Sequence, residues 1–417
     1  MIRSCLLALT LMTPIAQAQV MEGVPPSRDG QVTFENYREP PFSRWAFRNM
    51  GAPANVVMVP RQGNIHQLSR STESMEGAIE FDRSFADNHA NGVIVVHDGT
   101  ILHERYFGDF NEHAQHIWFS MTKSLVSASL GPLLASGEVD LQDSPADYVP
   151  ELADSGFART TLQEVLDHST AIDFKENYTD PRSDFFRYYA PALNMAWLPG
   201  AADVKPGKTK IYGVHDFLVE FIKPDARLQP GDAFDYNSAN ADVLGWVIAR
   251  VSGKPLQQYL QETIWSKLGA EHDAYMVADR AYMAVATGGM NSTLRDAARF
   301  GMMIRDRGRF GETQVIPAAW IDQTLRLNRR HISNMAANRK YSGDPWVAYH
   351  NMWWVLDANR GEYAANGIHG QTIYINQSAN TVMVWFSSQP VASAASNPSY
   401  HAKLEAARRL ANRLAED

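Results

Sequence analysis

The spacing of hydrophobic and polar positions predicts two separate blocks of strands. Between residues 92 and 107, two apolar runs flank Asp98-Gly99, which is the strongest short signal for a β-hairpin. Residues 372–386 contain two further apolar runs separated by a polar turn, and they predict a second hairpin. Residues 351–356 are predicted to form another strand. The predicted strands therefore lie early and late in the chain.

Helical spacing dominates the region between these strands. Gly137 and Gly253 follow apolar stretches and are typical helix stop signals. Thr161 and Glu164 form a capping box at the start of a predicted helix. The chain ends in an amphipathic helix at residues 399–414. The other predicted helices begin near Ser120, Asp242 and Leu294.

The order of these elements predicts a mainly helical domain inserted into an α/β domain. A chain of 417 residues is long enough for roughly two or three folding units. We expect an α+β fold in which helices flank an antiparallel sheet, with a ligand cleft at the domain junction near Ser120. The predicted parts are an extended lead-in at 19–84, an α/β domain at 85–137 and 286–417, and a mainly helical domain at 138–285.

The first residues have the pattern of a secretory signal peptide. Arg3 is followed by an apolar stretch at 5–12 and by a small-x-small site that predicts cleavage after Ala18. The stretch is shorter than the ~20 apolar residues that span a bilayer, so we expect no stable membrane anchor. Residues 1–18 would carry away Cys5, the only cysteine, which leaves no disulfide or thiol chemistry. A periplasmic or secreted protein is therefore predicted.

Composition and motif searches exclude several other classes. The formal net charge of −8 argues against nucleic acid as a partner, because phosphate binding needs a basic surface. There is no Gly-x-Ser-x-Gly elbow, which argues against an α/β-hydrolase. His113 and His116 lie three residues apart, but no carboxylate pattern completes a metal site around them. We therefore predict neither a metal nor another cofactor.

The main chemical motif is Ser120-x-x-Lys123 at the start of a predicted helix. Residues three apart on a helix share a face, so the hydroxyl and the amine can reach each other. A desolvated lysine has a lowered pKa and can help to deprotonate a serine nucleophile. Backbone N–H groups at the helix start would favour developing negative charge. The alternative interpretation is a capping serine and a surface lysine.

Two later motifs can complete this chemistry. Tyr236 stands just before the helix near Asp242, and a nearby lysine can lower the pKa of a phenol so that it acts as a general base. Gly367 and Gly370 lie at the entrance of a predicted edge strand, where glycines let a carbonyl approach backbone N–H groups. Each motif has a structural alternative, a packed aromatic in the first case and a glycine-bearing strand entrance in the second.

Together the three motifs resemble the penicillin-recognising serine hydrolases, which comprise class C β-lactamases, related esterases and D-alanyl-D-alanine peptidases. The resemblance covers roughly residues 85–400 and implies the β-lactamase/transpeptidase-like version of the α+β fold. Within this family the chain is most similar to the 6-aminohexanoate-dimer hydrolase group. The stretches that carry this similarity are 40–45, 176–181, 236–244 and 367–371.

The resemblance implies a role for each matching residue. Ser120 would be the acylated nucleophile and Lys123 its proton relay. Tyr236 would act as general base and as acid toward the leaving group. The oxyanion would bind the backbone N–H groups of Ser120 and Ile368, and Tyr178 would close over linear amides. Ser238 takes the place of the asparagine of the family, and His369 is grouped with the substrate-binding residues.

One departure from the family pattern narrows the predicted substrate. No Lys-Thr-Gly precedes the last strands, and that lysine grips the antibiotic carboxylate in β-lactamases. The sequence therefore predicts a serine hydrolase of esters or linear amides. A β-lactamase or D-alanyl-D-alanine peptidase stays open, as does a non-catalytic cell-wall binder. The expected partner is a small ester, amide or lactam, and the sequence indicates no oligomeric state.

Overall fold

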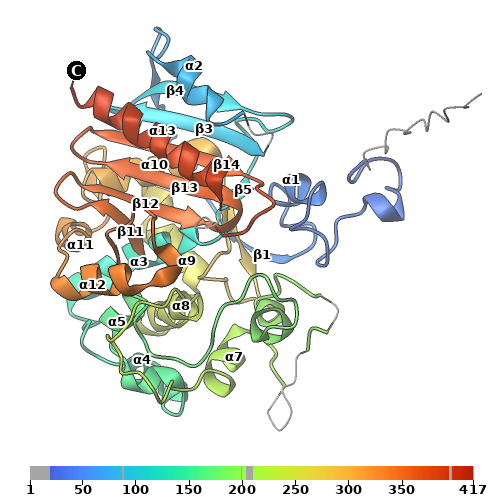
Figure 1. Cartoon of the computed structure of the whole chain (residues 1–417), viewed down its shortest axis with the longest axis vertical. Coiled ribbons are helices and arrows are strands. Elements are labelled where there is room, and N and C mark those ends of the chain that lie inside the picture. The colour runs from blue at the N-terminus through green and yellow to red at the C-terminus, as the bar shows by residue number, and fades with distance from the viewer. Residues whose placement is uncertain (1–18, 87–88, 199, 203–209, 394–396, 417) are drawn as a thin grey trace, which may run out of the picture.

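The fold has a sheet covered by helices on both faces and a mainly helical part beside it (Figure 1). The computed structural model describes residues 19–86, 89–198, 200–202, 210–393 and 397–416. The predicted signal peptide lies outside the described residues. None of the helices within the described ranges is long and apolar enough to cross a membrane.

The main sheet joins the two strand blocks that the sequence predicts. All neighbours are antiparallel except β2 and β4. The pairing of Thr381 with His97 and of Phe386 with Gly92 places the late hairpin beside the early one. Both predicted hairpins are confirmed. The strand order is β10 (Ala348–His350), β11 (Trp353–Asp357), β12 (Glu362–Gly367), β13 (Gln371–Asn376), β14 (Thr381–Ser387), β3 (Ala90–His97), β4 (Thr100–Tyr106) and β2 (Ser69–Arg70).

Two strand predictions were wrong in detail. Asn351 and Met352 have φ values of 50° and 63°, so they form a turn before β11 instead of beginning the strand. Their carbonyls accept hydrogen bonds from the hydroxyls of Ser127 and Ser124, which holds this turn against the nucleophile helix. The expected edge strand, β13, lies between β12 and β14 and is therefore internal.

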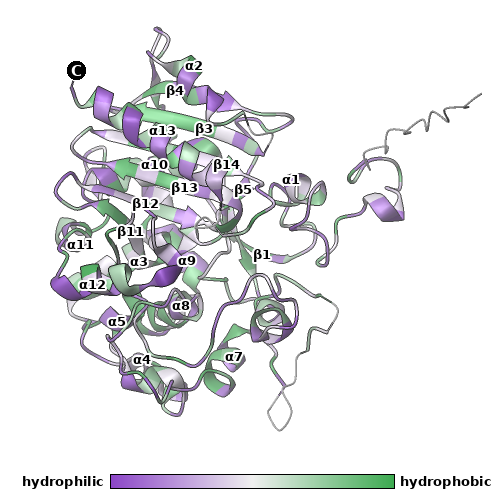
Figure 2. Cartoon of the chain, in the orientation of Figure 1, coloured by the Kyte–Doolittle hydropathy of each residue, from purple (hydrophilic) through white to green (hydrophobic). Residues whose placement is uncertain are grey.

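Long helices cover opposite faces of this sheet (Figure 1). Helix α10 (Leu294–Arg305) packs closely on β14, where a Cβ on Gly301 would lie 2.6 Å from Val382. On the other face lies α13 (Pro398–Leu414), near the contact between Trp385 and Phe85. The central strands are largely hydrophobic and the outward turns of α13 are polar (Figure 2). This contrast follows from burial on both faces of the sheet.

Helix α3 (Met121–Ser136) lies between the sheet and the helical part, with contacts to both β12 and α8 (Ala239–Ser252). Gly137 and Gly253 end these two helices in the left-handed conformation, as predicted. The capping box of α5 (Leu162–Leu166) is also confirmed. The remaining α-helices are α1 (Phe42–Ala46), α2 (Ala78–Arg83), α4 (Pro145–Tyr148), α6 (Ala190–Ala192), α7 (Val214–Glu220), α9 (Leu256–Thr263), α11 (Ala318–Gln323) and α12 (Arg329–Ala337).

Short helical turns connect these elements. The segment between α5 and α7 contains the π-helix η4 (Phe185–Tyr189). The 3₁₀ turns are η1 (Arg28–Gly30), η2 (Pro150–Leu152), η3 (Gly156–Arg159), η5 (Trp265–Lys267), η6 (Arg339–Tyr341) and η7 (Ile368–Gly370).

A smaller sheet contains the strand that directly precedes Ser120 in the chain. Its order is β1 (Asn55–Val59), β6 (Ala274–Ala278), β7 (Met290–Ser292) and β5 (His116–Ile117). β1 belongs to the predicted lead-in, which also contains the short helices α1 and α2. β8 (Arg309–Phe310) and β9 (Thr313–Gln314) form a separate pair. The domain boundaries given above stay a prediction.

Candidate active site

The turn between β5 and α3 presents Ser120. Phe119 has φ 47°, a left-handed conformation that is rare for a bulky side chain. Its ring lies edge-on to Phe47 at 4.9 Å, and the Trp118 N–H bonds the Met290 carbonyl. Tertiary contacts therefore hold the strained turn in place. Ser120 starts α3 without a capping bond from its side chain, which disfavours the capping alternative.

Lys123 is buried directly beside Ser120. Its side chain is 1% exposed, and Nζ lies 2.8 Å from Ser120 Oγ and 3.0 Å from the Thr287 carbonyl oxygen. Burial lowers the pKa of Lys123, against the opposing charges of Glu176 and Asp242. A buried amine with a lowered pKa spends more time neutral, and only the neutral amine can accept a proton from serine.

Tyr236 completes a compact group with these two residues. Lys123 Nζ lies 5.1 Å from the centre of the Tyr236 ring, which stacks on Trp354 at 5.4 Å. Burial raises the pKa of Tyr236, while a hydrogen bond with Ser120 lowers it. The lowered pKa that the sequence predicted for Tyr236 was wrong, because desolvation of the phenol dominates. The neutral phenol is thus the resting form.

The end of β12 lies against the nucleophile turn. A Cβ on Gly367 would lie 2.2 Å from the Trp118 carbonyl oxygen, so only glycine fits this contact. Ile368 follows at once and lines both cavities that Ser120 lines. The structure therefore brings together the two residues whose N–H groups are predicted to bind the oxyanion.

Two cavities meet at Ser120, and Tyr178 and Ile368 also line both. We call one the Tyr236 cavity. Its other lining residues include Tyr236, Trp346, Trp354, Lys340 and Asp344. We call the second the Arg38 cavity. Its other lining residues include Tyr37, Arg38, Phe185, Leu193, Met195 and Ser238. A substrate whose carbonyl is at Ser120 can therefore extend in two directions.

Tyr178 and Ser238 are held by Glu176. The Tyr178 hydroxyl donates to Glu176 Oε2 at 2.6 Å, and the Ser238 N–H donates to Glu176 Oε1 at 2.7 Å. The Ser238 hydroxyl bonds the Tyr178 phenol, whose pKa is raised mainly by burial. Ser238 therefore lies with Tyr178 on the wall of the Arg38 cavity, next to the nucleophile.

Comparison with known proteins identifies the family. The family model described as Beta-lactamase matches residues 81–407, which is most of the chain. The chain belongs to the β-lactamase family. Its helix-borne serine and lysine, with the tyrosine from the helical part, occupy one site in this fold, and it is a serine hydrolase of that family.

The chain is similar to proteins named as 6-aminohexanoate-dimer hydrolases. The 6-aminohexanoate-dimer hydrolase of Paenarthrobacter ureafaciens is 29% identical over 375 residues, which cover 88% of this chain and 90% of that protein. The solved structure of a "Putative 6-aminohexanoate-dimer hydrolase from Bacillus anthracis" has a TM-score of 0.80 at 27% identity, covering 94% and 99% of the two chains. A family VIII carboxylesterase shares the fold with a TM-score of 0.56 at 18% identity, covering 85% of this chain and all of that one.

His369 differs from its expected place in this β-lactamase-family site. Its imidazole Nδ1 lies 2.6 Å from the Gln389 carbonyl oxygen, and Arg38 donates from Nε to its Nε2 at 3.3 Å. The ring packs near Phe47 and Phe119 and lines neither cavity at Ser120. The imidazole therefore contacts Arg38 and the rings that hold the nucleophile turn, and it does not line the cavities at Ser120.

Sequence reasoning gave no role to a buried acid behind Lys123. Asp242 is 3% exposed; its Oδ1 accepts the Thr287 N–H at 3.0 Å and its Oδ2 accepts the Tyr189 hydroxyl. Burial raises the pKa of Asp242. Since Thr287 also accepts from Lys123, this acid supports the loop that orients the amine. Asp242 lies in the first turn of α8, and the apolar pattern of this helix predicts that it is buried. An acidic residue in a buried helix was the sequence feature that could have indicated this role.

His168 is a second residue that the sequence analysis passed over. Its ring lies 4.9 Å from that of Tyr236, and its Nδ1 accepts the Asn237 N–H at 3.0 Å. Burial, with the nearby charge of Lys123, holds the pKa of His168 well below its usual value. The neutral ring thus supports the backbone that presents Tyr236.

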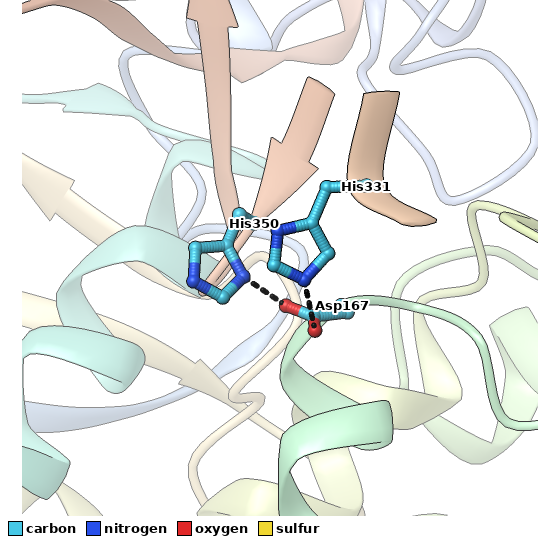
Figure 3. A group of neighbouring side chains, drawn as sticks. All are labelled: Asp167, His331 and His350. Carbon is cyan, nitrogen blue, oxygen red and sulfur yellow. Dashed lines mark hydrogen bonds and ion pairs between the residues drawn. The ribbon is translucent and has the colours of Figure 1, made fainter. Parts of the chain in front are cut away.

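One cluster outside the cavities at Ser120 has metal-ligand residue types. The ligand atoms of Asp167, His331 and His350 lie within 4.8 Å of one another, and both imidazoles point at the carboxylate (Figure 3). The two rings stack on each other at 4.1 Å with 28° between their planes. His350 Nδ1 and His331 Nε2 lie 2.6 Å and 3.3 Å from separate carboxylate oxygens. The cluster fits a hydrogen-bonded clamp joining the end of α5, α12 and β10 better than a metal site.

Proposed function

We propose that this chain cleaves short esters or linear amides through an acyl-enzyme on Ser120. The observation that carries the proposal is the buried Lys123 amine 2.8 Å from Ser120 Oγ, with Tyr236 beside both. The relative from Paenarthrobacter ureafaciens, named as a 6-aminohexanoate-dimer hydrolase, supports linear amides as a substrate class.

In acylation, neutral Lys123 takes the proton of Ser120 while Oγ forms a bond to the substrate carbonyl carbon. The carbonyl oxygen becomes an oxyanion, which the N–H groups of Ser120 and Ile368 stabilise. Breaking the bond to the leaving nitrogen or oxygen restores the carbonyl and leaves the acyl group on Ser120. Water then attacks the ester, its proton leaves through the same groups, and the acid is released with Ser120 restored.

Tyr236 serves this cycle as a proton donor and relay. Its phenol is neutral because burial raises its pKa, so it can protonate the leaving group as that bond breaks. The phenolate recovers a proton from the Lys123 ammonium, which lies against its ring. Since Tyr236 lines only one of the cavities at Ser120, the leaving group occupies the Tyr236 cavity and the acyl group the Arg38 cavity.

Replacing Tyr236 by Phe is expected to lower kcat by about 10²-fold, since the leaving group then departs without its proton donor. The loss should be smaller for an ester with a good leaving group than for an amide. Steady-state kinetics on a p-nitrophenyl ester and on a linear amide measure both effects. The matched control is Tyr374→Phe, which changes a buried tyrosine that is bonded to Glu362 and lines neither cavity at Ser120. A wild-type rate on both substrates would remove Tyr236 from this role.

A substrate panel separates the proposal from the two related activities that the family allows. Purified protein would be given p-nitrophenyl esters, the 6-aminohexanoate dimer, nitrocefin and a peptide ending in D-alanyl-D-alanine. We expect turnover of the ester or the linear amide to exceed that of the other two, since no Lys-Thr-Gly lysine is present to hold a carboxylate beside a lactam ring. Faster turnover of nitrocefin or the peptide would contradict the proposal.

We also propose that the protein is exported to the periplasm or beyond. The charged, apolar and small-x-small order of residues 1–18 supports this. Expression of the full chain in a Gram-negative host should yield a mature protein that begins at Gln19, as judged by intact mass and N-terminal sequencing. An uncleaved chain retained in the cytoplasm would contradict the proposal.

A further inference from the structure

An arginine from the lead-in reaches the cavity that contains the nucleophile. Tyr37 is buried and Arg38 half-buried, and both line the Arg38 cavity together with Ser120. These residues precede the region 81–407 that the family model matches. The lead-in therefore adds a cationic side chain to a site built by the rest of the chain.

His369 orients this guanidinium. Burial lowers the pKa of His369 to about 3, so the ring is neutral at any ordinary pH. Its Nδ1 donates to the Gln389 carbonyl at 2.6 Å, which leaves the Nε2 lone pair to accept from Arg38 Nε at 3.3 Å. The guanidinium also lies 5.6 Å from the centre of the Phe186 ring. These contacts fix Nε and the plane of the group, but they use neither terminal nitrogen.

Arg38 forms no ion pair with a carboxylate in the described part of the chain. Glu35 and Glu39 lie on the same segment and, with Arg38, line the neighbouring cavity beside Phe186, yet neither comes within 4.0 Å of its nitrogens. The lining of the Arg38 cavity also includes an apolar wall with Phe185, Leu193 and Met195. A half-buried, oriented guanidinium without an acid partner is suited to bind an anionic group from outside the chain.

We propose that Arg38 binds a terminal carboxylate on the acyl part of a linear substrate. The inference rests on the proposed function, since it is the reaction at Ser120 that places the acyl group in the Arg38 cavity. The apolar wall accommodates a methylene chain, and the guanidinium meets the carboxylate at its end. The substrate class is therefore linear half-esters or half-amides of dicarboxylic acids. A 6-aminohexanoyl group would instead bring an ammonium toward a guanidinium, and like charges repel.

Three esters with one leaving group test this directly. They are mono-p-nitrophenyl adipate, p-nitrophenyl hexanoate and p-nitrophenyl 6-aminohexanoate, which end in a carboxylate, a methyl and an ammonium group. We expect kcat/KM to fall in that order for the wild type. In Arg38→Gln the ratio of kcat/KM for adipate to that for hexanoate should fall by about 10- to 100-fold, the range for losing a charge-assisted hydrogen bond. Most of the fall should lie in KM.

The control variant is Arg409→Gln, which changes an exposed arginine of α13 that pairs with Glu405. Its ratio should equal that of the wild type. Equal ratios in wild type and Arg38→Gln would overturn the inference, as would a wild-type preference for the ammonium ester. Either result leaves the proposed function standing if the hexanoate ester is still hydrolysed through Ser120. Failure of the wild type to hydrolyse any of the three esters would instead count against the proposed function.

Discussion

Replacing Ser120 by Ala is expected to lower ester hydrolysis by about 10⁴-fold or more and to abolish labelling by a fluorophosphonate probe. The nucleophile forms the covalent intermediate, so no neighbouring group can substitute for it, and removal of a nucleophile typically has effects of this size or larger. The hydroxyl contacts Lys123 and Tyr236 but does not cap α3, so the fold should survive. The measurements are the p-nitrophenyl ester rate, the intact mass after labelling and the thermal midpoint.

Ser127 offers a matched control on the same helix. It is a buried serine of α3 whose hydroxyl bonds the Asn351 carbonyl at 2.8 Å, and it does not line either cavity at Ser120. Ser127→Ala should keep the probe label on Ser120. Persistent labelling in folded Ser120→Ala would show that another residue is the nucleophile.

Replacing Lys123 by Met should lower kcat/KM for the same ester by about 10³-fold, which lies within the range for losing a general base. Methionine fills a similar volume without the amine. Burial lowers the pKa of Lys123, so the neutral base accumulates as pH rises through that lowered value. The wild-type kcat/KM should therefore fall on acidification, with a midpoint below the ordinary lysine value. The residual kcat/KM of Lys123→Met should not show this fall at low pH, because the variant has no amine to protonate.

Lys403 provides the control, because replacing it by methionine also puts an apolar side chain in the place of a buried lysine. It is also 1% exposed, lies on α13 with its amine over the Phe85 ring, and lines neither cavity at Ser120. Lys403→Met should have the wild-type kcat/KM and the wild-type fall of kcat/KM on acidification. A Lys123→Met enzyme with the wild-type pH profile would show that Lys123 is not the base.

The sequence predicted the parts of the site that lie within short stretches of chain. Ser120 and Lys123 share a face of one helix, and the hairpins and helix stops depend on local turn chemistry, so their spacing alone was informative. The turn at Asn351 and Met352 was missed because hydroxyls from α3 hold it, over two hundred residues away in the chain. Hydrophobic periodicity reports only on nearby residues, so it cannot predict contacts between such distant segments.

Long-range packing also explains the other differences. Tyr236 was expected to have a lowered pKa beside Lys123, but the aromatic rings around it desolvate the phenol and raise the pKa instead. The roles of Asp242 and Arg38 depend on where Thr287 and His369 lie in space. No local pattern marks an arginine of the lead-in as part of a cavity formed by later segments.

Mass spectrometry of the enzyme quenched during turnover can detect the proposed acyl-enzyme on Ser120. Wild type mixed with excess p-nitrophenyl hexanoate would be stopped with acid, digested and mapped. We expect a hexanoyl adduct on the peptide that contains Ser120 in the wild type, and no such adduct in Ser120→Ala. An adduct on a different residue, or turnover with no adduct in wild type at any quench time, would contradict it.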